Sequence, residues 1–317
     1  MGVENLWKVV KGQAGTRRWE DFKGQRIGVD APNIIHSIAR RHALALARDA
    51  DPTALVKETV QFFRAAHQSK GVRLVIVFDG LAPPLKADEA ALRHDEKVRA
   101  MALPKALLLL KKELQGRLPG IDPVKARDAA AQLDDVAAEL CKKGTSLSRF
   151  MPAVIDAVRA TLVPGGGAPC CDELIVAPME AEAQLAFLCR TGYIAAAWSG
   201  DSDLVMLRTP TIIHDVVKKR LDVLVGADDF SGPQAKGKPN PLAPFADDAA
   251  LFCLYCSCHR CDYAPFMPPL APNAAASEAK FLCAAAAAAG KDGKHRNGFQ
   301  AALDAAAHRS RDRKSVV

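Results

Sequence analysis

The sequence of 317 residues has no run that approaches the roughly 20 apolar residues of a membrane-spanning helix. Residues 1–6 have no apolar signal core, so we expect a soluble intracellular protein with no membrane partner. Aromatic residues make up only 6% of the chain, and the hydrophobic core must therefore depend on Ala, Leu and Val, within a hydrophobic content of 49%. A chain of this length can form one large domain or two modest ones.

The cysteines lack the spacing of a structural zinc site. There are nine, and four of them crowd into residues 253–261. Structural zinc usually joins two separated pairs of ligands across a loop, and this run has no such spacer. Apolar side chains interleave with the thiols, which favours buried reduced cysteines over zinc, with zinc as the alternative. The four cysteines are Cys253, Cys256, Cys258 and Cys261.

Apolar runs alternate with helix-prone segments along most of the chain, which predicts an α/β fold with a mainly parallel sheet flanked by helices. A short helix followed by a basic loop is expected in residues 1–25. The expected strands are 26–30, 74–79, 174–177, 194–198, 211–216 and 221–225. The expected helices begin near Pro32 and Pro52 and also cover 151–163, 180–190 and 203–207.

Acidic residues follow the ends of several of these strands. Asp30 and Asp79 each close an apolar run, and an isolated Asp there is commonly only a turn residue. Two pairs of carboxylates spaced by two residues follow the next strands. Because the carboxyl ends of parallel strands line one crevice, these side chains should meet. The two pairs are Glu180 with Glu182, and Asp201 with Asp203.

Carboxylates gathered in one crevice repel one another unless cations lie between them. Oxygen-rich acidic clusters suit hard divalent ions such as Mg²⁺. Two such ions can clamp the attacking and leaving oxygens of a phosphodiester. The formal net charge of +7 favours a polyanionic partner without proving one. The sequence therefore predicts a metal-dependent nuclease.

Three cationic residues follow the Asp79 strand at offsets of seven and four, which places them on one helical stripe. This stripe, Lys86, Arg93 and Lys97, would overhang the acidic crevice and hold a substrate phosphate. The alternative is a solvated face that pairs with nearby acidic residues.

Five motifs occur in a fixed order: Met1-Gly2-Val3-Glu4-Asn5-Leu6-Trp7, Gly28-Val29-Asp30, Val77-Phe78-Asp79-Gly80 with Pro83-Pro84-Leu85-Lys86, Ala177-Pro178-Met179-Glu180-Ala181-Glu182-Ala183, and Gly200-Asp201-Ser202-Asp203-Leu204. Together they resemble the motifs of the flap endonuclease / XPG-like superfamily of structure-specific 5′ nucleases. The resemblance covers roughly residues 1–100 and 168–265. The composite is far more specific than any single motif.

The resemblance implies a PIN-like nuclease core in two parts, 1–84 and 151–265, with a helical arch at 85–150 and a divergent Ala-rich helical region and basic tail at 266–317. It implies two Mg²⁺ ions, for which Mn²⁺ could substitute. Asp30, Asp79, Glu180 and Glu182 would serve one ion; Asp201, Asp203 and Asp262 would serve the other. Lys86 and Arg93 match the basic gateway that contacts the scissile phosphate, and Gly2 would lie near the active site.

The chain departs from the family pattern after residue 260. The last metal ligand of the family normally follows a Gly-Ser pair, whereas Asp262 follows Arg260-Cys261. The family continues with a glycine-rich helix-two-turn-helix that grips duplex DNA with help from a potassium ion. Residues 264–272 contain no glycine and several prolines, so those turns cannot have the same backbone geometry. No sliding-clamp-binding segment is evident.

The expected function is hydrolysis of phosphodiesters in branched or 5′-flapped DNA during replication or repair, by a monomer in the nucleus. A mitochondrial location is the alternative. Asn33-Ile34-Ile35-His36 and Asp201-Ser202-Asp203-Leu204 also resemble the 5′–3′ exoribonuclease family, so an exonuclease that acts on RNA is a second reading. A nucleic-acid-binding scaffold that has lost catalysis is the third, although all seven acidic positions are present.

Overall fold

The computed structural model describes residues 6–10, 14–83, 147–163, 167–217 and 220–225, together with short pieces and single positions at 86, 91, 94–98, 106, 109, 132–133, 136–137, 141, 243, 252 and 256. Most of the expected arch at 85–150, and all of residues 257–317, lie outside the described residues. Among the described residues, no helix combines the length and apolar character that a membrane crossing requires.

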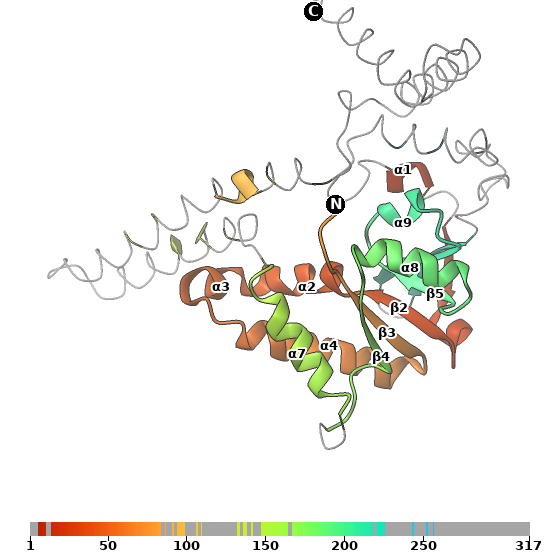
Figure 1. Cartoon of the computed structure of the whole chain (residues 1–317), viewed down its shortest axis with the longest axis horizontal. Helices are drawn as coiled ribbons and strands as arrows, with labels where there is room; N and C mark the ends of the chain where they lie inside the picture. Colours follow the sequence, from red (N-terminus) through yellow and green to blue (C-terminus); the bar gives the residue numbers. More distant parts are fainter. Residues whose placement is uncertain are drawn as a thin grey trace, which may run out of the picture.

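One sheet organises the described part of the chain, with the strand order β1-β7-β6-β5-β2-β3-β4. Figure 1 labels four of its strands, β2 to β5. All pairs from β6 across to β4 are parallel, whereas β7 is antiparallel to both β6 and β1. The mainly parallel sheet expected from the sequence is confirmed. The strands are β1 Gly15–Arg18, β2 Arg26–Asp30, β3 Arg73–Phe78, β4 Glu173–Val176, β5 Ala196–Trp198, β6 Thr211–Val217 and β7 Arg220–Val225.

Strand β1 replaces the basic loop expected before residue 26. All four of its residues are exposed, because it is an edge strand that pairs only with β7. An edge strand of this kind buries no side chains, so it leaves no alternation of apolar and polar residues in the sequence. The expectation of a loop was therefore wrong at this element.

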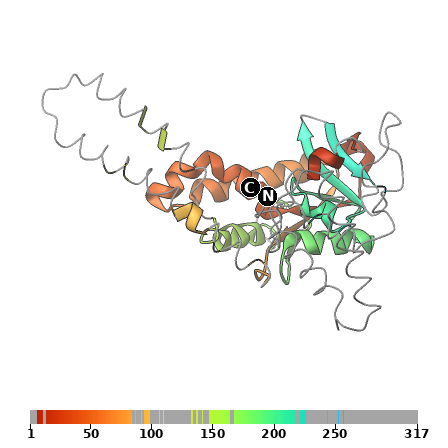
Figure 2. The same ribbon diagram turned by 90° about the horizontal axis from the view of Figure 1, so that it is seen from above.

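Helices pack on both faces of the sheet. They are α1 Leu6–Val10, α2 Ala31–Ala39, α3 Ala43–Asp49, α4 Thr53–Lys70, α7 Met151–Ala160, α8 Ala181–Arg190 and α9 Asp203–Met206. Viewed from above, α2 and α4 lie on one side of the sheet and α8 on the other (Figure 2). The helices expected near Pro32 and Pro52 and at 151–163, 180–190 and 203–207 are all present, with ends that differ by a few residues.

The sequence of β2 explains why both faces are covered. Ile27 and Val29 point into the core cluster that α2, α4 and α7 complete. Gly28 faces the other side, where an added Cβ would lie within 2.5 Å of Leu185 and Ile194. Glycine therefore lets α8 and the segment after it approach the sheet closely. Both packed layers hold β2 rigidly, and Asp30 at its end shares that rigidity.

Candidate active site

The candidate site lies where the strand order reverses. The chain runs from β2 outward through β3 to β4 and then returns to the other side of β2 as β5. In an open α/β sheet, this reversal leaves a crevice at the carboxyl ends of the strands. Asp30 ends β2, Asp79 follows β3, and the loop after β5 carries Asp201. Topology alone thus gathers three carboxylates from distant parts of the chain.

Asp30 is fully buried and is held by two hydrogen bonds. As the N-cap of α2, it accepts a hydrogen bond from the Asn33 backbone N–H at 3.1 Å. The Ser199 hydroxyl donates to its other carboxylate oxygen at 2.5 Å. Ser199 Oγ also accepts a hydrogen bond from the Asp201 N–H at 3.0 Å, so one serine joins the ends of β2 and β5. Asn33 adds a second link, because its side-chain oxygen accepts the Gly200 N–H at 3.3 Å.

The segments that follow β3 and β4 are also joined. The Gly80 N–H donates to the Met179 carbonyl at 2.6 Å, and the Asp79 carboxylate accepts the Ala181 N–H at 2.8 Å. A Cβ at Gly80 would lie 1.9 Å from the Ala177 carbonyl oxygen, so only glycine permits this close approach. The backbone of residues 79–81 therefore fixes where Asp79 lies relative to the start of α8.

Glu180 and Glu182 diverge at the start of α8. Glu180 is the N-cap, with extended backbone angles (φ −89°, ψ 144°), and Glu182 lies in the first turn. The Lys86 ammonium is 2.5 Å from a Glu180 carboxylate oxygen and 3.5 Å from Asp203 Oδ2. Glu182 instead interacts electrostatically with Asp30, Asp201 and Asp79. In the protein alone, Glu180 and Asp203 therefore share Lys86, whereas Glu182 faces Asp30 and Asp201; the two ligand sets implied by the resemblance stay a prediction.

Burial and repulsion between carboxylates raise the pKa of Asp30 and of Glu182. Burial, followed by the charges of Asp201 and Asp79, raises the pKa of the Asp30 carboxyl to about 7, against the lowering effect of its two hydrogen bonds. Burial together with Asp30 and Asp201 raises the pKa of Glu182 to about 9. Burial also raises the pKa of Asp79. Without a counter-charge, this cluster cannot hold all of its negative charges at neutral pH.

These residues fit a hard divalent cation in their chemistry, because their donors are oxygen and a cation would relieve the repulsion. No three His, Cys, Asp or Glu side chains in the described part of the chain are arranged to hold an ion by themselves. Mg²⁺ usually keeps several waters and takes only one or two carboxylates from the protein. Pairs such as Asp30 with Asp201 therefore suit Mg²⁺ better than a site closed by protein ligands.

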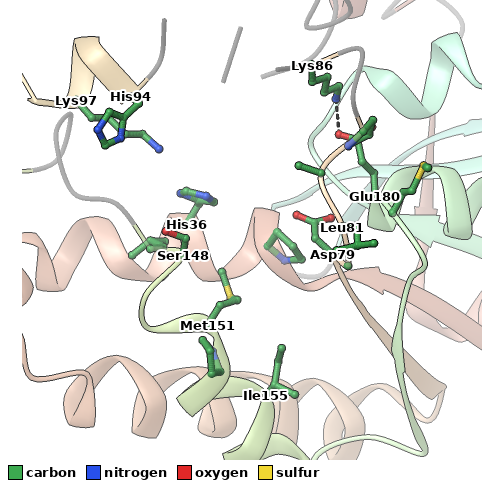
Figure 3. A pocket seen from close by; sticks show the side chains of 17 residues that line it. His36, Asp79, Leu81, Lys86, His94, Lys97, Ser148, Met151, Ile155 and Glu180 are labelled. Atoms are coloured by element: carbon green, nitrogen blue, oxygen red, sulfur yellow. Dashed lines mark hydrogen bonds and ion pairs between the residues drawn. The ribbon is translucent and has the colours of Figure 1, made fainter. Parts of the chain in front are cut away.

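A pocket of about 560 Å³ opens beside the carboxylates. Asp79, Glu180 and Lys86 lie on one side of it, and His36, His94 and Lys97 on the other (Figure 3). Burial and the positive charges of Lys97 and Arg40 lower the pKa of His36 to about 4, so its imidazole is neutral at pH 7. The pocket therefore has the Glu180 carboxylate paired with Lys86 at one wall and the Lys97 ammonium at the other.

The predicted site residues fall into three groups. The charge of Asp201 contributes to the raised pKa of Asp30, Asp79 and Glu182, and Glu180 and Asp203 share Lys86. Lys86 and Lys97 both line the pocket, from opposite sides (Figure 3), and the helical stripe of Lys86, Arg93 and Lys97 stays a prediction. Gly2, Arg93 and Asp262 lie outside the described residues.

Ser199 and Asn33 form hydrogen bonds that position the carboxylates, and neither was among the predicted site residues. Both are polar residues next to a buried strand end, where an unpaired polar side chain would be costly. That position is the signal that could have identified them. Trp7 is a third, since its indole N–H donates to the Gly200 carbonyl at 3.0 Å and its ring stacks on His214.

Comparison with known proteins identifies the family. The family model of the XPG N-terminal domain matches residues 1–100, and that of the XPG I-region matches residues 173–237. The chain belongs to the XPG-like superfamily. The two matched regions carry all the described carboxylates of the site, and the resemblance inferred from the motifs is confirmed.

The XPG-like chain is similar to several curated nucleases. It is 30% identical to "Flap endonuclease 1-1" of Paramecium tetraurelia over 237 residues, which cover 69% of this chain and 52% of that protein. It is 28% identical to "Exodeoxyribonuclease 1" of Schizosaccharomyces pombe, covering 67% of this chain and 32% of that protein. The chain thus spans about half the length of the flap endonucleases it matches.

A solved structure shares the fold of this XPG-like chain. The catalytic core of Rad2 in complex with DNA substrate superposes with a TM-score of 0.53 at 17% identity, covering 89% of this chain and 69% of that chain. At this identity the likeness establishes the fold. The PIN-like nuclease core expected from the motifs is therefore confirmed.

Proposed function

We propose that this chain is a metal-dependent 5′ nuclease that hydrolyses phosphodiester bonds in branched or 5′-flapped DNA. One observation carries the proposal: buried or part-buried carboxylates from the ends of β2, β3 and β5 and from the start of α8 meet in one crevice. A protein keeps mutually repelling buried acids at a cost to stability, which points to a functional reason for their placement. The similarity to flap endonucleases indicates that this function is hydrolysis of phosphodiester bonds.

The positions of the side chains suggest a role for each of them. Asp30, Asp201 and Glu182 would hold divalent ions, with Asp79 and the Glu180–Asp203 pair at the edge of the same crevice. When bound, such ions supply an activated water and stabilise the leaving oxygen. Ser199 keeps Asp30 and Asp201 at a fixed separation, and Ala181 N–H orients Asp79. Asp30, Asp201 and Asp79 are thus held by the fold before any substrate arrives.

Lys86 would supply positive charge to the phosphate that is cut. In the protein alone it pairs with Glu180 and Asp203. A divalent ion that takes over those carboxylates would leave the ammonium at the mouth of the pocket, where it can bind a phosphate oxygen. The negative charge that develops during phosphoryl transfer makes such a cation most useful in the transition state.

DNA is the preferred substrate, because the curated relatives named above are a flap endonuclease and an exodeoxyribonuclease and the solved relative holds DNA. The dependence on magnesium, the presence of two ions and a nuclear location also belong to this proposal. Binding should weaken as salt rises, because each phosphate contact releases counterions.

The test is cleavage of a 5′-flap DNA and a matched RNA substrate in Mg²⁺, comparing the wild type with Asp201→Asn. We expect cleavage of the flap DNA, and a rate at least about a hundredfold lower in the variant, as for the loss of a metal-ligand contact. Gln68→Ala, at an exposed position on α4, is the control and should cut normally. Preferential cleavage of the RNA would favour the exoribonuclease reading, and no cleavage of any substrate would favour the scaffold.

A further inference from the structure

A second pocket, of about 580 Å³, lies between helices α2 and α4 and strands β5 and β6. Its volume falls within the range typical of small-molecule sites. It contains none of the carboxylates discussed above, although Asn33 and Gly200 border it and also belong to the catalytic loop region. Neither the sequence motifs nor the proposed nuclease chemistry gives this pocket a role.

Aromatic rings form much of its wall. Phe62 of α4 and Trp198 of β5 line it, with ring centroids 5.9 Å apart. His214 of β6 also lines it, and its ring stacks on Trp7 at 3.7 Å, so the imidazole is held in place. Phe62 is only part-buried. Rings that are fixed by their neighbours offer a planar ligand stacking contacts at little entropic cost.

The polar part of the wall suits an anion. Lys70 is the charged residue of the pocket, and none of the described residues that line it is Asp or Glu. Its ammonium lies 5.6 Å from the centre of the Trp19 ring, and that ring packs edge-on against Trp198 of the pocket wall, with ring centroids 5.3 Å apart. The Ser37 and Ser69 hydroxyls and the Asn33 amide add hydrogen-bonding groups. A ligand that matches this wall combines a flat ring with a negative group.

We propose that this pocket binds a nucleoside 5′-monophosphate. The base supplies the planar ring that stacks on Phe62, and the phosphate supplies the negative charge that Lys70 attracts. The choice among planar anions rests on the proposed function, because a nucleoside 5′-monophosphate is the repeating unit of the DNA strand that a 5′ nuclease binds and cuts. The binding itself requires neither the metal ions nor catalysis.

The experiment measures binding to the full chain in EDTA, so that phosphate cannot be held by a divalent ion. dAMP is titrated by calorimetry, and Trp fluorescence is followed in parallel because Trp198 lines the pocket. Adenosine and inorganic phosphate are titrated separately. We expect saturable binding of dAMP with quenching, and weaker binding of each half alone.

Two variants localise the binding. Ala65→Trp fills the pocket from an exposed position on α4 and should weaken dAMP binding at least about tenfold, whereas Gln68→Trp, on the same helix outside the pocket, should bind like the wild type. Lys70→Met should weaken dAMP about fivefold and leave adenosine unchanged. Should Ala65→Trp fail to fold, Ser69→Phe serves the same purpose.

Absence of dAMP binding by the wild type, or equal binding by the wild type and the pocket-filling variant, would overturn the proposal. Neither result concerns cleavage, because the titration contains no DNA and no metal. Conversely, a chain that binds dAMP in this pocket but cuts no substrate would contradict the proposed nuclease activity and leave the pocket assignment standing.

Discussion

At the scale of single residues, the site depends on side chains that both stabilise the fold and position the carboxylates. Asp30 caps helix α2 and is also the most deeply buried member of the acidic cluster. Ser199 neutralises part of the cost of that burial and orients Asp201 at the same time. Because the hydrogen bonds that stabilise the fold also place the carboxylates, changes in charge and changes in shape can be separated only by careful choice of variant.

Asp30→Asn makes that separation and gives a pH prediction. With a pKa of about 7, native Asp30 holds its proton where the unfolded chain, at 3.8, has released it. The native state therefore binds more protons, and its free energy of unfolding falls as the pH rises from about 4 to about 7. Asn caps a helix as well as Asp, so Asp30→Asn should show a smaller fall, produced by the raised pKa of Glu182 and of Asp79.

The measurement is urea unfolding of both proteins in EDTA at several pH values. Relative to Asp30→Asn, the wild type should lose on the order of 2–4 kcal/mol between pH 4 and pH 7. Comparison of the two proteins is needed because His36, with its lowered pKa, contributes with the opposite sign over part of this range. Parallel stability curves for the two proteins would show that the Asp30 charge is not destabilised in the fold.

The sequence could identify the acidic residues and their order, because each follows an apolar run that ends at the same edge of a parallel sheet. It could not foresee that Glu180 and Glu182 would serve different neighbours. Their divergence depends on the residue at which α8 begins, and helix boundaries are set by capping contacts such as Asp79 with the Ala181 N–H. The pairing of Lys86 with Glu180 and Asp203 could not be foreseen either, because these partners lie 94 and 117 positions away from Lys86 in the sequence.

At the scale of elements, the junction between the ends of β3 and β4 decides the shape of the crevice. Backbone hydrogen bonds join residues 78–81 to 177–179, and Gly80 lies at the tightest point. The sequence shows a glycine directly after Asp79, but nothing in a single segment reveals which distant backbone will approach it. Strand β1 could not be predicted for a related reason, because an exposed strand that pairs only with β7 shows no alternation of apolar and polar residues.

Gly80→Ala tests whether this junction positions the site. The added Cβ would meet the Ala177 carbonyl at 1.9 Å and force the two segments apart. We expect a loss of about 1–3 kcal/mol in unfolding free energy and a fall in flap cleavage larger than that loss explains at temperatures where the protein stays folded. Thermal melts and single-turnover cleavage rates give the two quantities.

Gly15→Ala is the matched control, since a Cβ there meets nothing within 4 Å. It should alter neither quantity measurably. Cleavage by Gly80→Ala at the wild-type rate would show that the separation of Asp79 from the start of α8 is not important for the reaction.

At the scale of the whole molecule, a chain with a formal net charge of +7 concentrates negative charge at one edge of its sheet. The strand order explains this arrangement. Asp30 and Asp201 lie 171 positions apart in the sequence, and they come together because β5 returns to pair with β2. The α/β class could be predicted from the alternation of strand-like and helix-like segments. The crevice could be predicted because ligand sites in such sheets lie at the carboxyl ends of the strands. The contribution of Asp262, outside the described residues, stays a prediction.

The most direct test of this account is a crystal of the protein grown with Mn²⁺, with data collected at the manganese absorption edge. We expect anomalous density in the crevice, within ligand distance of Asp30 or Asp201 and of the neighbouring Asp79 or Glu182, and its loss in Asp201→Asn. Manganese found only elsewhere on the surface, or a crevice with no anomalous density at millimolar Mn²⁺, would contradict the claim that these carboxylates form a divalent metal site.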